Sequence, residues 1–247
     1  MQRVVIHVEY GGLGDHLFHS PIPRLLKEKG IADAVYLSGQ SKFRSKETYE
    51  FVWRNNPYLD GIAHEGRQAP VAVPARVDKL MNRIAAAYGI DGLCEELCPE
   101  VYCRPQHNKS YEGLDLLDLN YISFVGALSD WDLIAIAKRC VGYKILNPSR
   151  MLRTFVVNET IYSKDFNDYL SMIYSCRHFA CLTSGGATVA SALRKQATVY
   201  YGWGHPDTNR HSSNDNIMVG GGGVYRQVLC RLLFKRNQMR ILFSRNK

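Results

Sequence analysis

Short apolar runs alternate with helical stretches along most of this chain, and this alternation limits the possible folds more than any other feature. The predicted strands are residues 4–8, 34–39, 121–126, 143–147, 179–183 and 198–202. The predicted helices are residues 21–29, 44–54, 76–88, 130–140, 165–176 and 186–195. Such alternation is typical of βαβ units and a parallel sheet. We therefore predict an α/β protein; residues 89–118 receive no assignment.

The chain is basic, and its positive charge is concentrated at the end. The 247 residues include 31 Lys and Arg against 23 Asp and Glu, which gives a formal charge of +8. Residues 224–247 carry seven basic side chains, no acid, and interleaved apolar residues. A basic amphipathic segment of this kind can lie on an anionic membrane surface, or it can pack on the core with its cations reaching water. The sequence leaves both alternatives open.

Features of the sequence also indicate a compartment. No apolar run approaches the roughly 20 residues that span a bilayer, and the opening MQRVVIHVEYGG is too short an apolar stretch for a signal peptide. The seven cysteines are odd in number and unevenly spaced, which favours reduced thiols. We expect a cytoplasmic protein that can attach peripherally to the inner face of the membrane.

The stretch EYGGLGDHLFHSPIPRLLKEKG, residues 9–30, places a glycine-rich turn after the first strand. Such turns at helix starts usually receive phosphate, so the carboxylate of Asp15 either starts the helix or has another chemical task. The helix begins either at Pro21 with Ser20 as its N-cap, or at Asp15 with a kink near Pro21. Both alternatives leave Asp15 at the carboxyl end of the first strand, where open α/β sheets bind their ligands.

Several motifs that would define other enzyme classes are missing. A dinucleotide-binding G-x-G-x-x-G would need glycine in place of Leu17, and no G-x-x-x-x-G-K-[ST] or G-x-S-x-G occurs. These gaps argue against a nicotinamide dehydrogenase, a P-loop enzyme and an ordinary α/β-hydrolase.

Two groups of residues are candidate metal ligands. The run SDWD at 129–132 contains a D-x-D, but Ser129 and Asp132 also form a capping box, which is the favoured interpretation. The second group has a spacing that matches no common zinc pattern: Cys94, Cys98, Cys103 and His107. We expect no metal and no cofactor.

A second glycine turn, within residues 181–212, suits phosphate better than the first. A strand ends there, a turn of small residues follows, and a helix begins, with hydroxyl groups and no acid in the turn. The next strand ends in a further glycine-rich loop. The residues that we expect to bind a ligand here are Thr183, Ser184, Gly185, Gly186, Thr188 and Gly202.

Together these stretches resemble glycosyltransferase family nine, the ADP-heptose:lipopolysaccharide heptosyltransferase group. GGLGDHLFHSPIPRLLKEKG resembles the family's opening motif, NPYLD at 56–60 its short motif near the end of the first βαβ unit, and FACLTSGGATVASALRKQATVYYGWGHPD its donor-site signature. The resemblance implies a GT-B-like fold with two Rossmann-type parallel-sheet domains, the second shortened. We place an acceptor-side domain at residues 1–140 and a donor-binding domain at 141–247.

The resemblance also implies roles for residues of the first turn. Asp15 corresponds to the family's catalytic base, which takes the proton of an acceptor hydroxyl while that oxygen attacks the anomeric carbon of the donor sugar. The nucleotide diphosphate then leaves from the opposite face, with inversion and without a metal. Gly12, Gly14 and His16 would lie on the acceptor side.

The second turn would hold the donor, with some departures from the family pattern. Thr183 stands where the family has Asp and Thr188 where it has His, so the transferred sugar need not be heptose. The family's phosphate-binding Lys, after the first strand of the second domain, has no counterpart, and Arg150 or Arg153 would take its place.

The function predicted from the sequence is an inverting, metal-independent glycosyltransferase in surface-glycan assembly. Its donor would be a nucleotide-diphosphate sugar, and its acceptor a lipopolysaccharide, polysaccharide or lipid-linked saccharide. One alternative is a nucleotide-sugar epimerase, or another nucleotide-sugar-binding enzyme, on the same scaffold. A second is a non-catalytic basic protein that binds nucleic acid or membrane. The charge fits that class but the position of Asp15 does not, so we expect no nucleic-acid partner.

Overall fold

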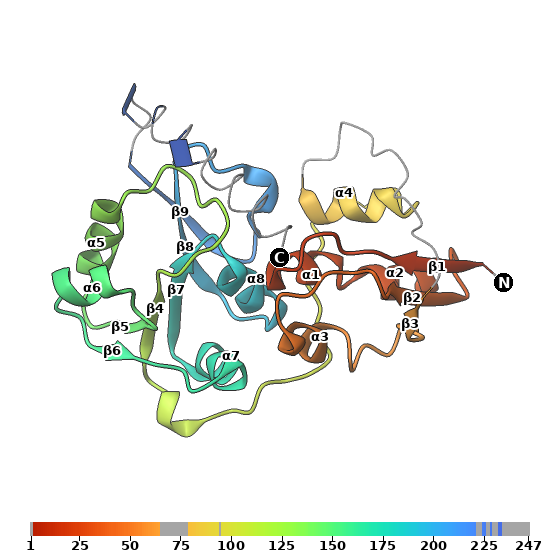
Figure 1. Cartoon of the computed structure of the whole chain (residues 1–247), viewed down its shortest axis with the longest axis horizontal. Coiled ribbons are helices and arrows are strands. Elements are labelled where there is room, and N and C mark those ends of the chain that lie inside the picture. The colour runs from red at the N-terminus through yellow and green to blue at the C-terminus, as the bar shows by residue number, and fades with distance from the viewer. Residues whose placement is uncertain are drawn as a thin grey trace. The chain divides into compact units, whose positions relative to one another are not determined.

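The computed structural model describes residues 2–64, 79–93, 95–220, 224, 225, 228, 232 and 233. The chain divides into two compact units (Figure 1). The first comprises residues 1–104 with segments 191–193 and 207–211, and the second comprises 105–190, 194–206 and 212–247. Each unit contains its own parallel sheet.

The first unit has a three-stranded parallel sheet in the order β1-β2-β3. Its apolar strand β1 is buried from its second residue on, as expected for a strand covered by helices. The elements are β1 (Arg3–Ile6), α1 (Leu13–His19), α2 (Ile22–Glu28), β2 (Ala34–Ser38), α3 (Lys46–Val52), β3 (Ile62–Ala63) and α4 (Leu80–Ala87).

The structure decides between the two helix starts that the sequence left open. Helix α1 begins at Leu13, and α2 begins at Ile22 directly after Pro21. Ser20 does not cap α2: its hydroxyl donates to the carbonyl oxygen of Leu17 at 2.7 Å. The helix therefore starts beside Asp15 and is interrupted at the proline, because proline has no amide hydrogen to continue the ladder.

The second unit has a six-stranded parallel sheet in the order β6-β5-β4-β7-β8-β9. Its strands are β4 (Asp115–Asp118), β5 (Lys144–Leu146), β6 (Thr160–Ile161), β7 (His178–Leu182), β8 (Ala197–Gly202) and β9 (Asp215–Val219). The α-helices are α5 (Asp130–Arg139), α6 (Arg150–Phe155), α7 (Phe166–Ser175) and α8 (Gly185–Ala192). Two 3-10 turns are also present, η1 (Lys109–Tyr111) in the second unit and η2 (Asp207–Asn209) in a segment of the first.

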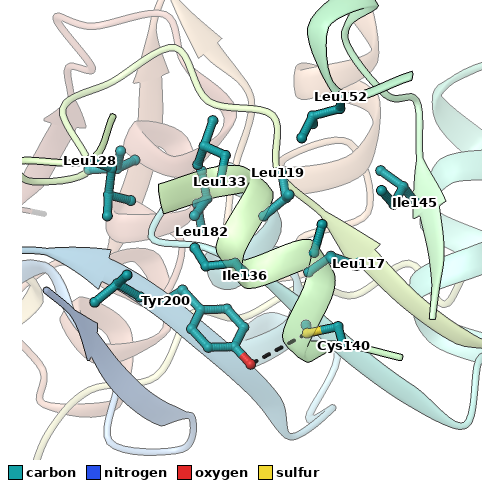
Figure 2. Close-up of a cluster of buried hydrophobic side chains, with 14 residues drawn as sticks. Leu117, Leu119, Leu128, Leu133, Ile136, Cys140, Ile145, Leu152, Leu182 and Tyr200 are labelled. Carbon is teal, nitrogen blue, oxygen red and sulfur yellow. Dashed lines mark hydrogen bonds between the residues drawn. The ribbon is translucent and has the colours of Figure 1, made fainter. Parts of the chain in front are cut away.

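Helices α5 and α6 lie on one side of the larger sheet, and α7 and α8 lie on its other side (Figure 1). The face toward α5 and α6 carries a buried apolar cluster, which includes Leu117, Ile136, Ile145 and Leu182 (Figure 2). At the end of α5, Cys140 Sγ lies 3.5 Å from the Tyr200 hydroxyl of β8. This cluster fixes α5 across the centre of the sheet.

The predicted boundary between residues 140 and 141 lies too late in the chain. Strand β4 pairs with both β5 and β7, so it is a central strand of the larger sheet. Residues 105–140 consequently pack with the second unit. Within the described ranges the second unit has six strands and the first has three.

Most predicted elements are present, but one predicted strand is not. Residues 121–126 form a loop rather than a strand, and that loop ends in Gly126, whose φ of +89° lies outside strand geometry. Strands β3, β4, β6 and β9 and helix α6 were not predicted. They are short, with two to six residues each, so their hydrophobic patterns are too brief to detect.

Candidate functional site

The first candidate site is the turn between β1 and α1. Asp15 is the third residue of α1, and its Oδ2 accepts a hydrogen bond from the backbone amide of Gly12 at 3.2 Å. A Cβ on Gly12 would lie 2.6 Å from that oxygen. Glycine at this position therefore lets the carboxylate fold back over the turn. Gly14, partly exposed, precedes Asp15 in the same helical turn.

Burial raises the pKa of Asp15 from 3.8 to about 6, while the nearby Arg44 guanidinium and the Gly12 amide oppose this shift. A carboxylate with this pKa is ionised at neutral pH and is a stronger base than an ordinary aspartate. General bases work best when their pKa lies near the operating pH. The hydrogen bond to Gly12 also stabilises the helix start, which is one of the two roles that the sequence left open for Asp15.

The loop after β2 holds Arg44 beside this turn. The Arg44 amide donates to the carbonyl oxygen of Gly11 at 2.9 Å, and the Lys42 amide donates to that of Val8 at 3.1 Å. A Cβ on Gly11 would lie only 3.0 Å from the Arg44 nitrogen, so a glycine is needed for this approach. These contacts fix a cation next to the Asp15 carboxylate.

His16, which we expected on the acceptor side, has no exposed surface. Its Nδ1 accepts from Trp53 Nε1 at 2.9 Å, and its Nε2 donates to the carbonyl oxygen of Lys42 at 2.7 Å. Burial lowers the pKa of His16 to about 4, so the ring is neutral. His16 supports the loop that carries Arg44.

The second candidate site lies in the larger sheet, at the carboxyl ends of β4 and β7. The chain runs outward from β4 to β5 and β6, then returns to place β7 on the other side of β4. The strand order therefore reverses between β4 and β7. In open α/β sheets, ligands bind at the carboxyl edge at such a point.

The predicted donor turn follows β7 directly at this reversal. Ser184 and Gly185 are partly exposed, and within the described chain no hydrogen bond is formed by the amides of Gly185 and Gly186. The Thr183 hydroxyl is buried and has no hydrogen-bond partner among the described residues. Free amides at the start of a helix, next to an unsatisfied hydroxyl, favour an anionic ligand.

Gly186 and Thr188 are both buried, so they support this turn from the protein interior and do not face outward. A Cβ on Gly186 would lie 2.8 Å from the Tyr169 hydroxyl, so a glycine lets α8 pack closely on the sheet and on α7. The Thr188 hydroxyl lies 3.5 Å from the carbonyl oxygen of Ser184 and donates to it within the helix.

Gly202 was predicted to bind the donor, but it is enclosed by the loop that follows β4. A Cβ on Gly126 would lie 2.1 Å from the Gly202 carbonyl oxygen, and one on Gly202 would lie 2.5 Å from the Ala127 nitrogen. The Gly202 amide donates to the carbonyl oxygen of Val125 at 2.8 Å. The two glycines therefore attach this loop to the end of β8, which is a structural role.

Asp118, at the end of β4, is a site residue that the sequence did not reveal. It is buried, and it accepts from the Tyr169 hydroxyl at 2.7 Å and from the amide and side chain of Asn120 at 2.9 and 2.8 Å. Burial raises the pKa of this carboxyl. The sequence signal for Asp118 is the run DLLDLN, in which this acid directly follows two buried leucines. Asp118 lies within residues 89–118, for which the sequence predicts no element.

Arg150 and Arg153 lie on α6, after the second strand of this sheet and not after the first. Both are exposed, and neither forms an ion pair within the described ranges. The loop after the first strand, residues 119–129, contains no Lys or Arg at all. These arginines therefore follow β5, which β4 separates from β7, the strand that leads into the donor turn.

The capping interpretation of residues 129–132 is confirmed. The Oδ2 of Asp132 accepts from the Ser129 amide at 2.7 Å and from its hydroxyl at 2.6 Å. The described residues contain no group of three or more His, Cys, Asp or Glu that could hold a metal ion, and Cys94 lies outside them.

The basic tail, residues 224–247, lies mostly outside the described residues. Its described positions include four exposed apolar side chains: Val224, Tyr225, Val228 and Leu232. No helix in the described part of the chain has the length and apolar character needed to cross a membrane.

Comparison with known proteins identifies the fold. No protein-family profile matches the sequence, and no curated protein matches it. Among solved structures, a family 9 glycosyl transferase from Veillonella parvula superposes with a TM-score of 0.59 at 10% identity, over 88% of this chain and 85% of that one. The iron-containing dodecameric glycosyltransferase TibC from enterotoxigenic E. coli gives 0.61 at 14% identity, and this chain covers 64% of its length.

A third similar structure is ADP-heptose lps heptosyltransferase II of E. coli, with a TM-score of 0.52 at 13% identity over the full length of both chains. The predicted fold class is thus confirmed: the protein is a mixed α/β protein with parallel sheets, like the GT-B-like heptosyltransferase structures. At these identities the similarity establishes the fold, and the function has to be argued from the sites.

Proposed function

We propose that this protein is a glycosyltransferase that moves a sugar from a nucleotide-diphosphate donor to a glycan or lipid-linked saccharide. The observation that carries the proposal is Asp15, a carboxylate at the carboxyl end of β1 with a pKa raised to about 6. A carboxylate would repel a phosphate group bound in a glycine turn. A turn beside an acceptor hydroxyl has a use for this carboxylate, because a general base must accept the proton of that hydroxyl.

In the proposed reaction, the Asp15 carboxylate takes the proton from the acceptor hydroxyl as that oxygen forms a bond to the anomeric carbon. The bond between this carbon and the diphosphate oxygen breaks on the opposite face, so the configuration inverts. Both electrons of that bond leave with the nucleotide diphosphate. The free amides of Gly185 and Gly186 and the hydroxyl of Thr183 would offset the charge of the leaving group.

The choice of ligand is supported by the solved relatives in fold. One TibC structure is described in complex with ADP-D-beta-D-heptose, and an E. coli heptosyltransferase, WaaC, is described with ADP. An adenine nucleotide diphosphate is therefore the first probe for this chain. We also propose that the reaction needs no metal, that the protein acts on the cytoplasmic side, and that the tail at 224–247 attaches it to an anionic membrane surface.

The test has a binding arm and a reaction arm. ADP should bind in calorimetry, and ADP-sugar should release ADP only when an acceptor glycan is present. Asp15→Asn should lower that release by about 10²- to 10⁴-fold, the usual contribution of a general base, and leave ADP affinity unchanged. Chelator should not alter the rate.

Each result against the proposal has a distinct meaning. Full transfer by Asp15→Asn would reduce Asp15 to a helix-start residue. Conversion of the donor sugar without acceptor would indicate an epimerase instead of a transferase. Salt-sensitive binding to arbitrary DNA, with no affinity for ADP, would favour the nucleic-acid alternative.

A further inference from the structure

An exposed aromatic pair lies on the second unit, on the side of the sheet covered by α5 and α6. Trp131, the second residue of α5, is 74% exposed, and Phe155, the last residue of α6, is 56% exposed. Their ring centroids lie 6.3 Å apart. Val157 is fully exposed two residues beyond Phe155. We call these three residues the apolar tip.

The side chains of the apolar tip are not needed to fill the core. The interior of this face is filled by other side chains of the same helices, such as Leu133, Ile136 and Leu152, which are at most 5% exposed. Trp131 and Phe155 contact each other across the two helices while most of their surface remains in water. Exposed apolar patches on a folded protein usually mark a contact with a partner or a membrane.

The charges around the apolar tip favour an anionic partner. Arg150 and Arg153 are exposed on the same two-turn helix as Phe155, within about 8 Å along its axis at 1.5 Å per residue. The nearby acids are Asp130 and Asp132, in the first turn of α5, and Glu159. Asp132 is buried and caps the helix through Ser129, and the Glu159 carboxylate pairs with Lys144 at 2.7 Å. Arg150 and Arg153 therefore add two positive charges to the helix that carries Phe155, and neither forms an ion pair within the described residues.

We infer that the apolar tip is a membrane contact, in which Trp131, Phe155 and Val157 enter the headgroup region of a bilayer and Arg150 and Arg153 bind anionic lipid. Trp is enriched at membrane–water interfaces because its ring is amphipathic, and cations near the surface bind anionic headgroups. The two rings are inclined by 51°, so they do not form the flat platform on which a sugar would stack.

The position of the apolar tip relates it to the donor turn. Trp131 follows the loop that leaves the carboxyl end of β4, so it lies at the same edge of the sheet as the turn after β7. A bilayer bound at the apolar tip would therefore contact the carboxyl edge of the sheet. The inference concerns a surface separate from the tail at 224–247, and it does not depend on the proposed transfer reaction.

The test is binding of the full chain to phosphatidylcholine vesicles with and without phosphatidylglycerol, without donor or acceptor. The double variant Trp131→Ala/Phe155→Ala should bind phosphatidylglycerol vesicles at least tenfold more weakly. Arg150→Gln and Arg153→Gln should each weaken binding about fivefold, and only to the anionic vesicles. The matched control is Val141→Ser, an equally exposed apolar residue just past the opposite end of α5, which should bind like the wild type.

A measurement on the unaltered protein keeps the inference testable if a variant is unstable. Brominated lipid should quench part of the tryptophan fluorescence, and Trp131→Phe should remove that part. Trp53 cannot supply it, because this side chain is only 1% exposed, and quenching of the partly exposed Trp203 would persist in Trp131→Phe. Equal vesicle binding by the wild type and the double variant would refute the inference. So would a dimer that the double variant abolishes while vesicle binding stays the same, since the apolar tip would then be a protein interface.

Discussion

Removal of the charge of Arg44 should raise the pKa of Asp15 above 6. Asp15 Oδ2 and Arg44 Nη1 lie 2.6 and 3.6 Å from the same point, the position of a Cβ on Gly12, so they are at most about 6 Å apart. Opposite charges at this distance attract each other by about 0.7 kcal/mol in water and more in a less polar medium. Because Arg44 is exposed, we expect the lower end, a rise of about 0.5 to 1 pKa unit in Arg44→Gln.

The direction of the effect on activity follows from the role of a base. Asp15 must be ionised to accept a proton, so the rate should rise with pH through its pKa and level off above it. In Arg44→Gln this rise should move to higher pH. The variant should then be about three- to tenfold slower below pH 6 and nearly unchanged at pH 8.

The pKa can be measured without knowing the acceptor. Carbon-13 NMR titration of the aspartate carboxyl groups gives it directly, with Asp15→Asn to assign the signal. Lys46→Gln is the matched control, since it removes one exposed positive charge from the first residue of α3. An Asp15 titration that stays in place in Arg44→Gln, or that moves equally in Lys46→Gln, would refute the local interaction.

Further predictions concern the second unit. Gly126→Ala should lower the free energy of unfolding in urea by about 3 kcal/mol or more, because its Cβ meets the Gly202 backbone. Gly142 has a φ of +85°, similar to the +89° of Gly126, but nothing lies within 4 Å of a Cβ at this position, so Gly142→Ala should lower the free energy of unfolding by only about 1 to 2 kcal/mol. Equal losses in the two variants would contradict the packing argument. Gly185→Asp should abolish ADP binding in calorimetry, and unchanged affinity in the folded variant would move the donor site elsewhere. Tyr169→Phe should cost about 1 to 3 kcal/mol in urea unfolding by removing a donor to buried Asp118, and an unchanged transition would exclude that bond.

The sequence by itself determined the α/β class, because hydrophobic periodicity and glycine turns are local signals. It also identified both turns, at Asp15 and at Ser184–Gly185, since each lies within a few residues of a detectable strand. The capping role of Asp132 was accessible for the same reason: the partner, Ser129, is three residues away. Chemistry that depends on neighbours in the chain can be recognised without a structure.

The tertiary structure decided what depends on residues far apart in the chain. The pairing of β4 with β7 makes Asp118 a neighbour of the donor turn and moves the domain boundary. Gly126 and Gly202 are 76 positions apart in the sequence, so only the structure reveals their contact, in which neither position tolerates a side chain. His16 could be taken for a ligand-facing residue until Trp53 and Lys42 were seen to use both of its nitrogens. Burial and strand pairing leave no local pattern in the sequence. They nevertheless decide whether a side chain supports the fold or is available for chemistry.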